Sequence, residues 1–94
     1  MRRQYLICYD IAHPGRLRRV HRTVRDFGDA LQYSVFSCSL SKKDLAVLEA
    51  RLRPILHCGE DQVLLIDLGP EHSPAHCRTL GRAIESGLPA VLVF

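Results

Sequence analysis

Residues 5–11 read Tyr5-Leu6-Ile7-Cys8-Tyr9-Asp10-Ile11, a run of aromatic and branched side chains that holds a single carboxylate near its end. A run of this kind without a turn-forming residue predicts a buried β-strand. Asp10 is the exception in it. A carboxylate at a strand end either binds a divalent cation or caps the turn that follows. The residue types alone leave both interpretations open.

The segment after this strand is basic and amphipathic. Its apolar residues recur at helical spacing: Leu17, Val20, Val24 and Phe27. This pattern predicts a helix that begins at His13-Pro14 and ends before Gly28, which suits the left-handed position just past a helix end. Five arginines occupy the rest of the circumference: Arg16, Arg18, Arg19, Arg22 and Arg25. They predict a nucleic-acid-binding face, and a solvated basic face without a ligand is the alternative.

Residues 31–40 are rich in strand formers, with Gly28-Asp29 before them and Ser41 after them. Strict alternation places Phe36 on the same face as two other apolar residues, Cys38 and Leu40. The stretch contains neither Gly nor Asn at a plausible turn. We therefore expect either a sharp bend near Ser34 or Ser37, or one long bent strand.

The second half of the chain continues the alternation of helix and strand. Ser41 and Asp44 have the spacing of a capping box, and the apolar residues after them predict a helix that ends near residues 57–59. Residues 63–68 form an apolar run of strand length, which Gly69-Pro70 ends. A short helix is expected over residues 74–86. Residues 90–94 predict a strand that must pair with its own sheet or with a second copy of the chain.

Two strand–helix–strand units in succession predict an α+β fold, a two-layer sandwich with both helices on one face of the sheet. Ferredoxin-like βαββαβ topology satisfies this order with the fewest elements. At 94 residues the chain is expected to be a single domain, with a core over residues 3–68 and a C-terminal dimerisation and partner-docking segment over residues 69–94. An elaborate pocket would need a partner subunit.

Composition excludes several classes. No apolar stretch reaches the roughly 20 residues of a membrane span, and Met1-Arg2-Arg3 leads directly into a strand, so a cytoplasmic protein is expected. The net charge of +3 is small, so the grouping of the arginines matters more than the total. The four cysteines are expected to be reduced thiols, because no pair has zinc-knuckle spacing. A mixed zinc site is the weaker alternative, built from Cys58, His72, His76 and Cys77.

Several segments together resemble the CRISPR-associated protein 2 family, the small subunit of the spacer-acquisition complex. The resemblance runs from about residue 4 to residue 68 and rests on four segments in one chain of this size. These are the strand Tyr5-Leu6-Ile7-Cys8-Tyr9-Asp10-Ile11, the helix Arg16-Leu17-Arg18-Arg19-Val20, the string Gln32-Tyr33-Ser34-Val35-Phe36 and the helix that opens at Ser41.

The resemblance implies a homodimeric, ferredoxin-like, magnesium-dependent endonuclease acting on RNA or DNA, which also bridges two CRISPR integrase dimers. In that family the C-terminal strand adds to the sheet of the other protomer. Asp10 matches the metal-binding aspartate, with two copies facing each other across the dimer axis. Tyr9, Arg19 and Phe36 fall where the family has residues implicated in activity.

The chain departs from the family pattern just after Asp10. Residues 12–15 are Ala-His-Pro-Gly, where family members often carry hydroxyl or acidic residues, so less local support for a metal is expected. A non-catalytic DNA-binding scaffold is therefore one alternative, and a toxin-like relative that cleaves messenger RNA is another. Phe36 is expected at the dimer interface.

Overall fold

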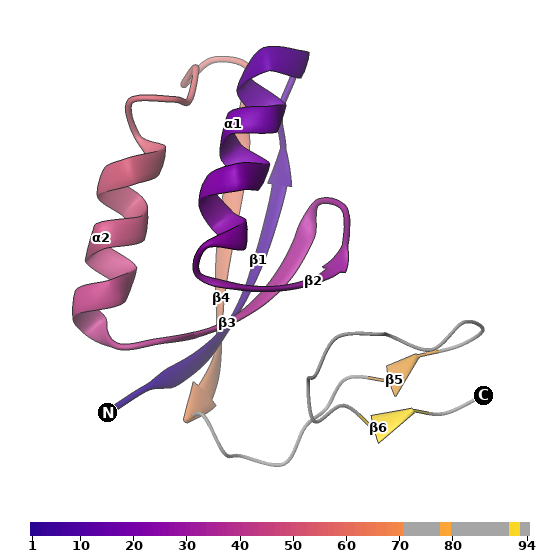
Figure 1. The fold of residues 1–94 in the computed structure, drawn as a ribbon, viewed down its shortest axis with the longest axis vertical. Coiled ribbons are helices and arrows are strands. Elements are labelled where there is room, and N and C mark those ends of the chain that lie inside the picture. The colour runs from indigo at the N-terminus through magenta and orange to yellow at the C-terminus, as the bar shows by residue number, and fades with distance from the viewer. Residues whose placement is uncertain (71–77, 80–90, 93–94) are drawn as a thin grey trace.

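The computed structural model describes residues 1–70, 78–79 and 91–92 of the chain. The elements occur in the order β1 (Arg3–Asp10), α1 (Pro14–Arg25), β2 (Gly28–Gln32), β3 (Val35–Leu40), α2 (Lys42–Leu52), β4 (Gln62–Pro70), β5 (Arg78–Thr79) and β6 (Val91–Leu92). Figure 1 shows both helices on the same side of the main sheet.

The main sheet has the strand order β2-β3-β1-β4, and each neighbouring pair is antiparallel. The two strands at its centre, β1 and β3, are each joined to their sequence neighbour through a helix. This is the βαββαβ order of a ferredoxin-like fold, and the expected α+β architecture is confirmed. The sheet therefore has one face covered by α1 and α2 and one face that they leave open.

Alternation along β1 separates the core from the open face. Ile7 and Tyr9 are buried under the helices, whereas Asp10 at the strand end is exposed. On β3, Phe36 is fully buried, together with Cys38 and Leu40 as the alternation predicted. The expectation that Phe36 lies at a dimer interface is wrong, because its side chain is enclosed by the core of its own chain.

The stretch over residues 31–40 is split by a turn at Tyr33-Ser34, the first of the two expected alternatives. Two hydrogen bonds from Tyr9 of β1 hold this turn in place. The hydroxyl of Tyr9 donates to the Tyr33 carbonyl oxygen at 2.7 Å, and the Tyr9 backbone N–H donates to the Ser34 carbonyl oxygen at 3.1 Å. Contacts with β1 thus supply what Gly or Asn would supply locally.

Gly28 does not adopt the left-handed conformation expected of it. It is the first residue of β2, and among the described glycines only Gly69 has a positive φ, of 101°. A Cβ atom at Gly28 would instead collide with the Cys38 side chain and the Ser37 carbonyl oxygen. Glycine is required at this position because β3 approaches closely.

Both helix starts agree with the sequence. His13 caps α1, its side chain accepting a hydrogen bond from the Gly15 N–H, and Ser41 forms a capping box with Asp44. The end of α2 was predicted too late, near residue 57, whereas the helix ends at Leu52. Pro54 explains the early end, because it has no N–H to continue the helical hydrogen bonding.

The described part of the C-terminal segment forms a separate two-stranded parallel sheet, in which β5 pairs with β6. The helix predicted over residues 74–86 is wrong at Arg78–Thr79, which are extended, and its other residues lie outside the described part. The described residues of the terminal strand pair within the chain. His72, His76 and Cys77 of the alternative zinc set also lie outside the described residues.

Within residues 1–70, 78–79 and 91–92, no helix has the length and apolar character needed to cross a membrane.

Candidate functional site

Asp10 lies at the end of β1, opposite Gln62 of β4 in the sheet register, and its side chain is exposed. Across the described residues, no group of three or more His, Cys, Asp and Glu side chains is arranged to hold a metal ion. Asp10 therefore offers one carboxylate. Magnesium is often held by one or two carboxylates, with water and substrate phosphates completing its coordination, so a single exposed carboxylate fits this ion only as part of a shared site.

A second carboxylate near this strand end, that of Asp61, is engaged in hydrogen bonds within the protein. It accepts hydrogen bonds from Arg16 Nε at 2.7 Å, from the Ala12 N–H at 3.0 Å and from the His57 N–H at 2.9 Å. Its side chain has no exposed surface. Asp61 thus joins the loop after β1, the start of α1 and the loop before β4, and it fixes the backbone two residues beyond Asp10.

The charge state of Asp61 follows from these contacts. Hydrogen bonding from the Arg16 guanidinium, assisted by the two backbone N–H groups, holds the pKa of the Asp61 carboxyl far below its ordinary value of 3.8. The same hydrogen bond raises the pKa of Arg16. Both groups are charged throughout the neutral range, so Asp61 serves as a structural anion and is unsuited to proton transfer.

We expect Asp61→Asn to lower the melting temperature at neutral pH, because Arg16 loses its buried carboxylate partner and keeps only the exposed Glu60. A carboxyl whose pKa falls on folding contributes stability above its unfolded pKa, near 4, and loses it as pH falls through the folded value. The difference between wild type and Asp61→Asn should therefore stay constant from pH 7 to about pH 4 and narrow below it. Thermal unfolding at each pH measures this.

Glu60→Gln is the matched control, because Glu60 also contacts Arg16 but is more than half exposed. It should change the melting temperature little. An Asp61→Asn profile that runs parallel to wild type down to pH 2 would contradict the structural role given to this carboxylate.

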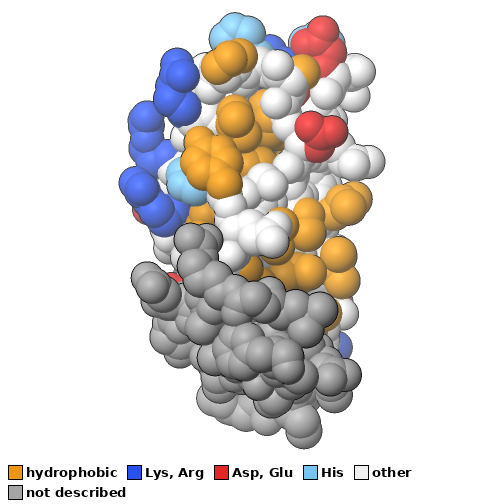
Figure 2. All heavy atoms as spheres, turned by 90° about the vertical axis from the view of Figure 1, so that its right-hand side faces the viewer, with side chains coloured by type: hydrophobic (Ala, Val, Ile, Leu, Met, Phe, Trp, Pro, Cys, Tyr) orange, Lys and Arg blue, Asp and Glu red, His pale blue; other side chains and the backbone are white. Residues whose placement is uncertain are grey.

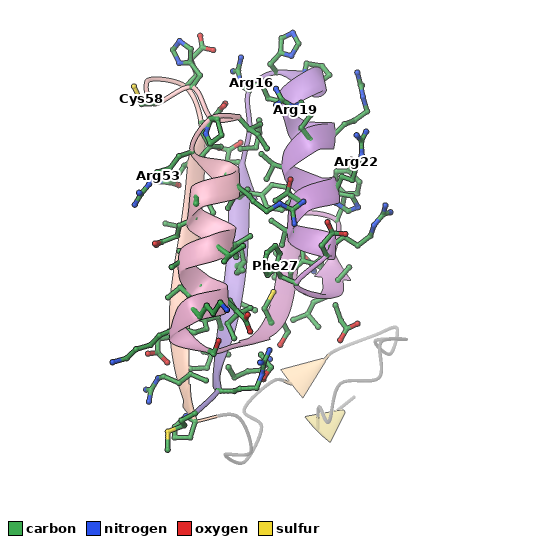
Figure 3. The ribbon with its side chains drawn as sticks, turned by 60° about the vertical axis from the view of Figure 1, so that its left-hand side comes forward. Arg16, Arg19, Arg22, Phe27, Arg53 and Cys58 are labelled. Carbon is green, nitrogen blue, oxygen red and sulfur yellow. The ribbon has the colours of Figure 1, made fainter. Side chains whose placement is uncertain are left out.

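The five arginines of α1 divide into two groups. The guanidinium of Arg16 is engaged by Asp61 and by Glu60, at 2.7 and 3.0 Å, and is only partly exposed. The other four are exposed, and their guanidinium groups have no hydrogen bond or ion pair within the described part of the chain: Arg18, Arg19, Arg22 and Arg25. We call these four the arginine face. Figure 3 shows Arg19 and Arg22 along α1, and Arg53, which directly follows α2, pointing away from α1.

The arginine face has an energetic reason to bind an anion. Arg18 and Arg22 are four residues apart on one helix, a spacing at which like charges repel. The first turn of α1 carries no acidic side chain. A bound phosphate would offset this repulsion, and the backbone of a nucleic acid offers phosphates in a row.

Tyr9 and Phe36, two of the residues implicated by the resemblance, lie in the core beneath this face. Tyr9 is 6% exposed, and its hydroxyl oxygen lies 2.8 Å from His21 Nδ1. Burial, with a smaller effect of Tyr33, raises the pKa of Tyr9 to about 12, so its hydroxyl stays protonated. The Phe36 ring has no exposed surface and lies 6.2 Å from the Tyr9 ring. Both residues can support the strand that carries Asp10.

The structure thus brings Asp10, Asp61 and Arg16 to one end of the fold and spreads the arginine face along α1. The sequence interpretation missed Asp61. Arg16 and Asp61 are 45 residues apart, and no spacing rule links residues at that separation. His21 was also not assigned a role, because its contact with Tyr9 exists only after α1 packs on β1.

Comparison with known proteins decides the family. The model of the family described as "CRISPR associated protein Cas2" matches residues 3–74. The chain belongs to the Cas2 family. A relative in Geobacter sulfurreducens, named CRISPR-associated endoribonuclease Cas2, is 41% identical over 70 residues, which are 74% of each chain. A second endoribonuclease Cas2, of Thermodesulfovibrio yellowstonii, is 38% identical over 88 residues, covering 94% of this chain and 96% of the relative.

Solved structures of Cas2 proteins share the fold. Streptococcus pyogenes Cas2 superposes with a TM-score of 0.66 at 31% identity, over 70% of this chain and 86% of that one. Another structure named Cas2 gives a TM-score of 0.74 at 28% identity, over 97% and 99% of the two chains. Asp10, Asp61 and the arginine face all lie inside the segment matched by the Cas2 family model.

Proposed function

We propose that this Cas2 family chain is an endonuclease subunit that hydrolyses phosphodiester bonds of single-stranded RNA, duplex DNA or both, and that it acts in CRISPR spacer acquisition. The observation that carries the proposal is the exposed carboxylate of Asp10 at a strand end, in a molecule with four exposed arginines on the adjacent helix. The names of the relatives support the ribonuclease activity.

Asp10 is the proposed ligand of Mg²⁺, together with Asp10 of a second copy across the dimer axis. When bound, magnesium supplies an activated water and neutralises charge on the scissile phosphate. The chain's own groups bind and orient the substrate: Arg19 and its neighbours on the arginine face contact phosphate oxygens, and Asp61 holds the backbone that follows Asp10. Tyr9 and Phe36 hold β1 in place through their packing in the core.

A homodimer is part of the proposal. The open face of the sheet exposes three apolar side chains of β4, Leu64, Ile66 and Leu68. Figure 2 shows hydrophobic side chains gathered on this side of the molecule. A second copy would cover such a surface. The terminal strand at residues 90–94, whose described residues pair with β5 in this chain, would add to the partner's sheet through its other edge. The dimer is proposed to bridge two CRISPR integrase dimers.

A second candidate function is a scaffold that binds DNA and cleaves nothing. It is favoured by the single carboxylate at the site and by the lack of a metal-binding cluster within the described residues. The arginine face serves either function equally. Cleavage assays on labelled single-stranded RNA and duplex DNA, with magnesium or with a chelator, separate the two. Product that forms with magnesium and disappears with the chelator supports the enzyme.

Changing Arg18 and Arg22 to Ala should weaken nucleic-acid binding to a similar extent for unrelated sequences. Each lost phosphate contact on duplex DNA should reduce the slope of log K against log salt by about 0.9, because fewer counterions are released. Fluorescence anisotropy titrations over a range of salt concentrations measure the slope. Arg53→Ala is the matched control, because this exposed arginine points away from α1 (Figure 3). If the slope of log K against log salt is unchanged in both the Arg18 and the Arg22 variant, the arginine face is a solvated surface that does not bind nucleic acid.

A further inference from the structure

Tyr33, at the tip of the β2–β3 hairpin, is 57% exposed, yet its ring is held in place. It stacks on the imidazole of His21 with centroids 4.4 Å apart and planes inclined by 12°. His21 in turn meets the buried Phe36 ring edge-on at 5.3 Å. A large exposed aromatic ring is thus connected through His21 to the core.

The turn does not need the Tyr33 side chain. The Tyr33 carbonyl oxygen, not its ring, accepts the hydrogen bond from the Tyr9 hydroxyl and lies 3.1 Å from His21 Nδ1. Any residue would present the same carbonyl. The ring therefore adds one stacking contact to the fold and leaves most of its surface in solvent, where a second π-face can stack on it.

The Tyr33 ring also borders the arginine face. His21, on which it stacks, is three residues after Arg18 and four residues before Arg25, and such neighbours lie on one side of a helix. Arg18 and Arg25 are about 10 Å apart along the axis at the helical rise. Figure 2 shows hydrophobic side chains beside a histidine, with basic side chains along the neighbouring edge.

We propose that the Tyr33 ring is a stacking platform for an unpaired base of a single-stranded nucleic acid whose phosphates contact Arg18 and Arg25. The inference rests on the proposed function and names the substrate form that this surface favours. Bases in a duplex are already stacked on one another, whereas an unpaired base has a free π-face. RNA and DNA share this chemistry, so the platform accepts either.

The test is equilibrium binding of a fluorescently labelled single-stranded RNA, its DNA counterpart and a duplex, all with a chelator so that nothing is cleaved. Tyr33→Ala should weaken binding to the single strands by about 5- to 150-fold, the range for loss of one base–aromatic stack. Binding to the duplex and the salt slope should be unchanged. Tyr33→Phe should keep wild-type affinity.

Three further measurements guard against a folding effect. Tyr33→Leu keeps apolar bulk but removes the π-face, so it should lose affinity as Tyr33→Ala does. Val47→Ala, an exposed apolar change on α2, should have no effect. An abasic position in the oligonucleotide should weaken binding to wild type and leave Tyr33→Ala unaffected.

Equal losses for single strands and duplex, or wild-type affinity in Tyr33→Leu, would overturn the platform. So would a wild type that does not bind single strands. Failure of the proposed nuclease is recognised separately: binding that depends on Tyr33 without any magnesium-dependent cleavage would reject the enzyme and keep the platform.

Discussion

Changing Asp10 to Asn should reduce magnesium-dependent cleavage by about 100-fold or more, because the variant keeps the volume of the side chain and removes the charge needed at the scissile phosphate. The side chain is exposed at the end of β1 and contributes nothing to the core, so the fold should be intact. Initial rates on labelled single-stranded RNA and duplex DNA, at several magnesium concentrations, measure the loss.

The controls for this variant follow from the fold. Light scattering and oligonucleotide binding should match wild type, because the open sheet face and the arginine face are untouched. Asp29→Asn removes a different exposed carboxylate, on β2, and should cleave normally. Cleavage that persists in Asp10→Asn points to a contaminating nuclease or to another ligand, and it would leave the scaffold as the better interpretation.

The same variant ranks the two candidate functions in cells. Spacer uptake that survives Asp10→Asn would make bridging the main role, with cleavage secondary, as the single carboxylate and the Ala-His-Pro-Gly sequence after it favour. Loss of both cleavage and spacer uptake in a well-folded, dimeric variant would make catalysis primary.

Phe36→Ala should lower the free energy of unfolding by about 3–5 kcal/mol, the cost of emptying a fully buried aromatic site. This is a large share of the roughly 5–15 kcal/mol that stabilises a domain of this kind. The ring packs against Tyr9 and His21, so its removal should also loosen the Tyr33-Ser34 turn. Urea unfolding measures the change.

Phe36→Leu is the companion variant, because leucine is apolar and removes less side-chain volume than alanine does. It should lower the free energy of unfolding by much less than Phe36→Ala. It should also retain most of the cleavage activity, as expected of a residue that supports β1 without contacting substrate. A Phe36→Ala protein with wild-type unfolding but a weaker dimer would place this ring at an interface instead of in the core.

The sequence by itself determined the elements whose causes are local. The apolar stripe of α1, its start at His13-Pro14 and the capping box of Ser41 with Asp44 each act within a few residues, and all three appear in the structure. The position of Asp10 at the end of a strand was predicted in the same way, from the apolar run that leads up to it. These features were predictable because the residue patterns of helices and strands repeat every few residues.

Only the tertiary structure decided the features that depend on approach between distant segments. The Tyr33-Ser34 turn exists because Tyr9, 24 residues away, holds its carbonyl. Gly28 is needed because β3 lies against it. Arg16 is not part of the arginine face because Asp61, 45 residues away, pairs with its guanidinium. Contacts of this kind leave no periodic pattern in a sequence, since they form only when the helices have packed on the sheet.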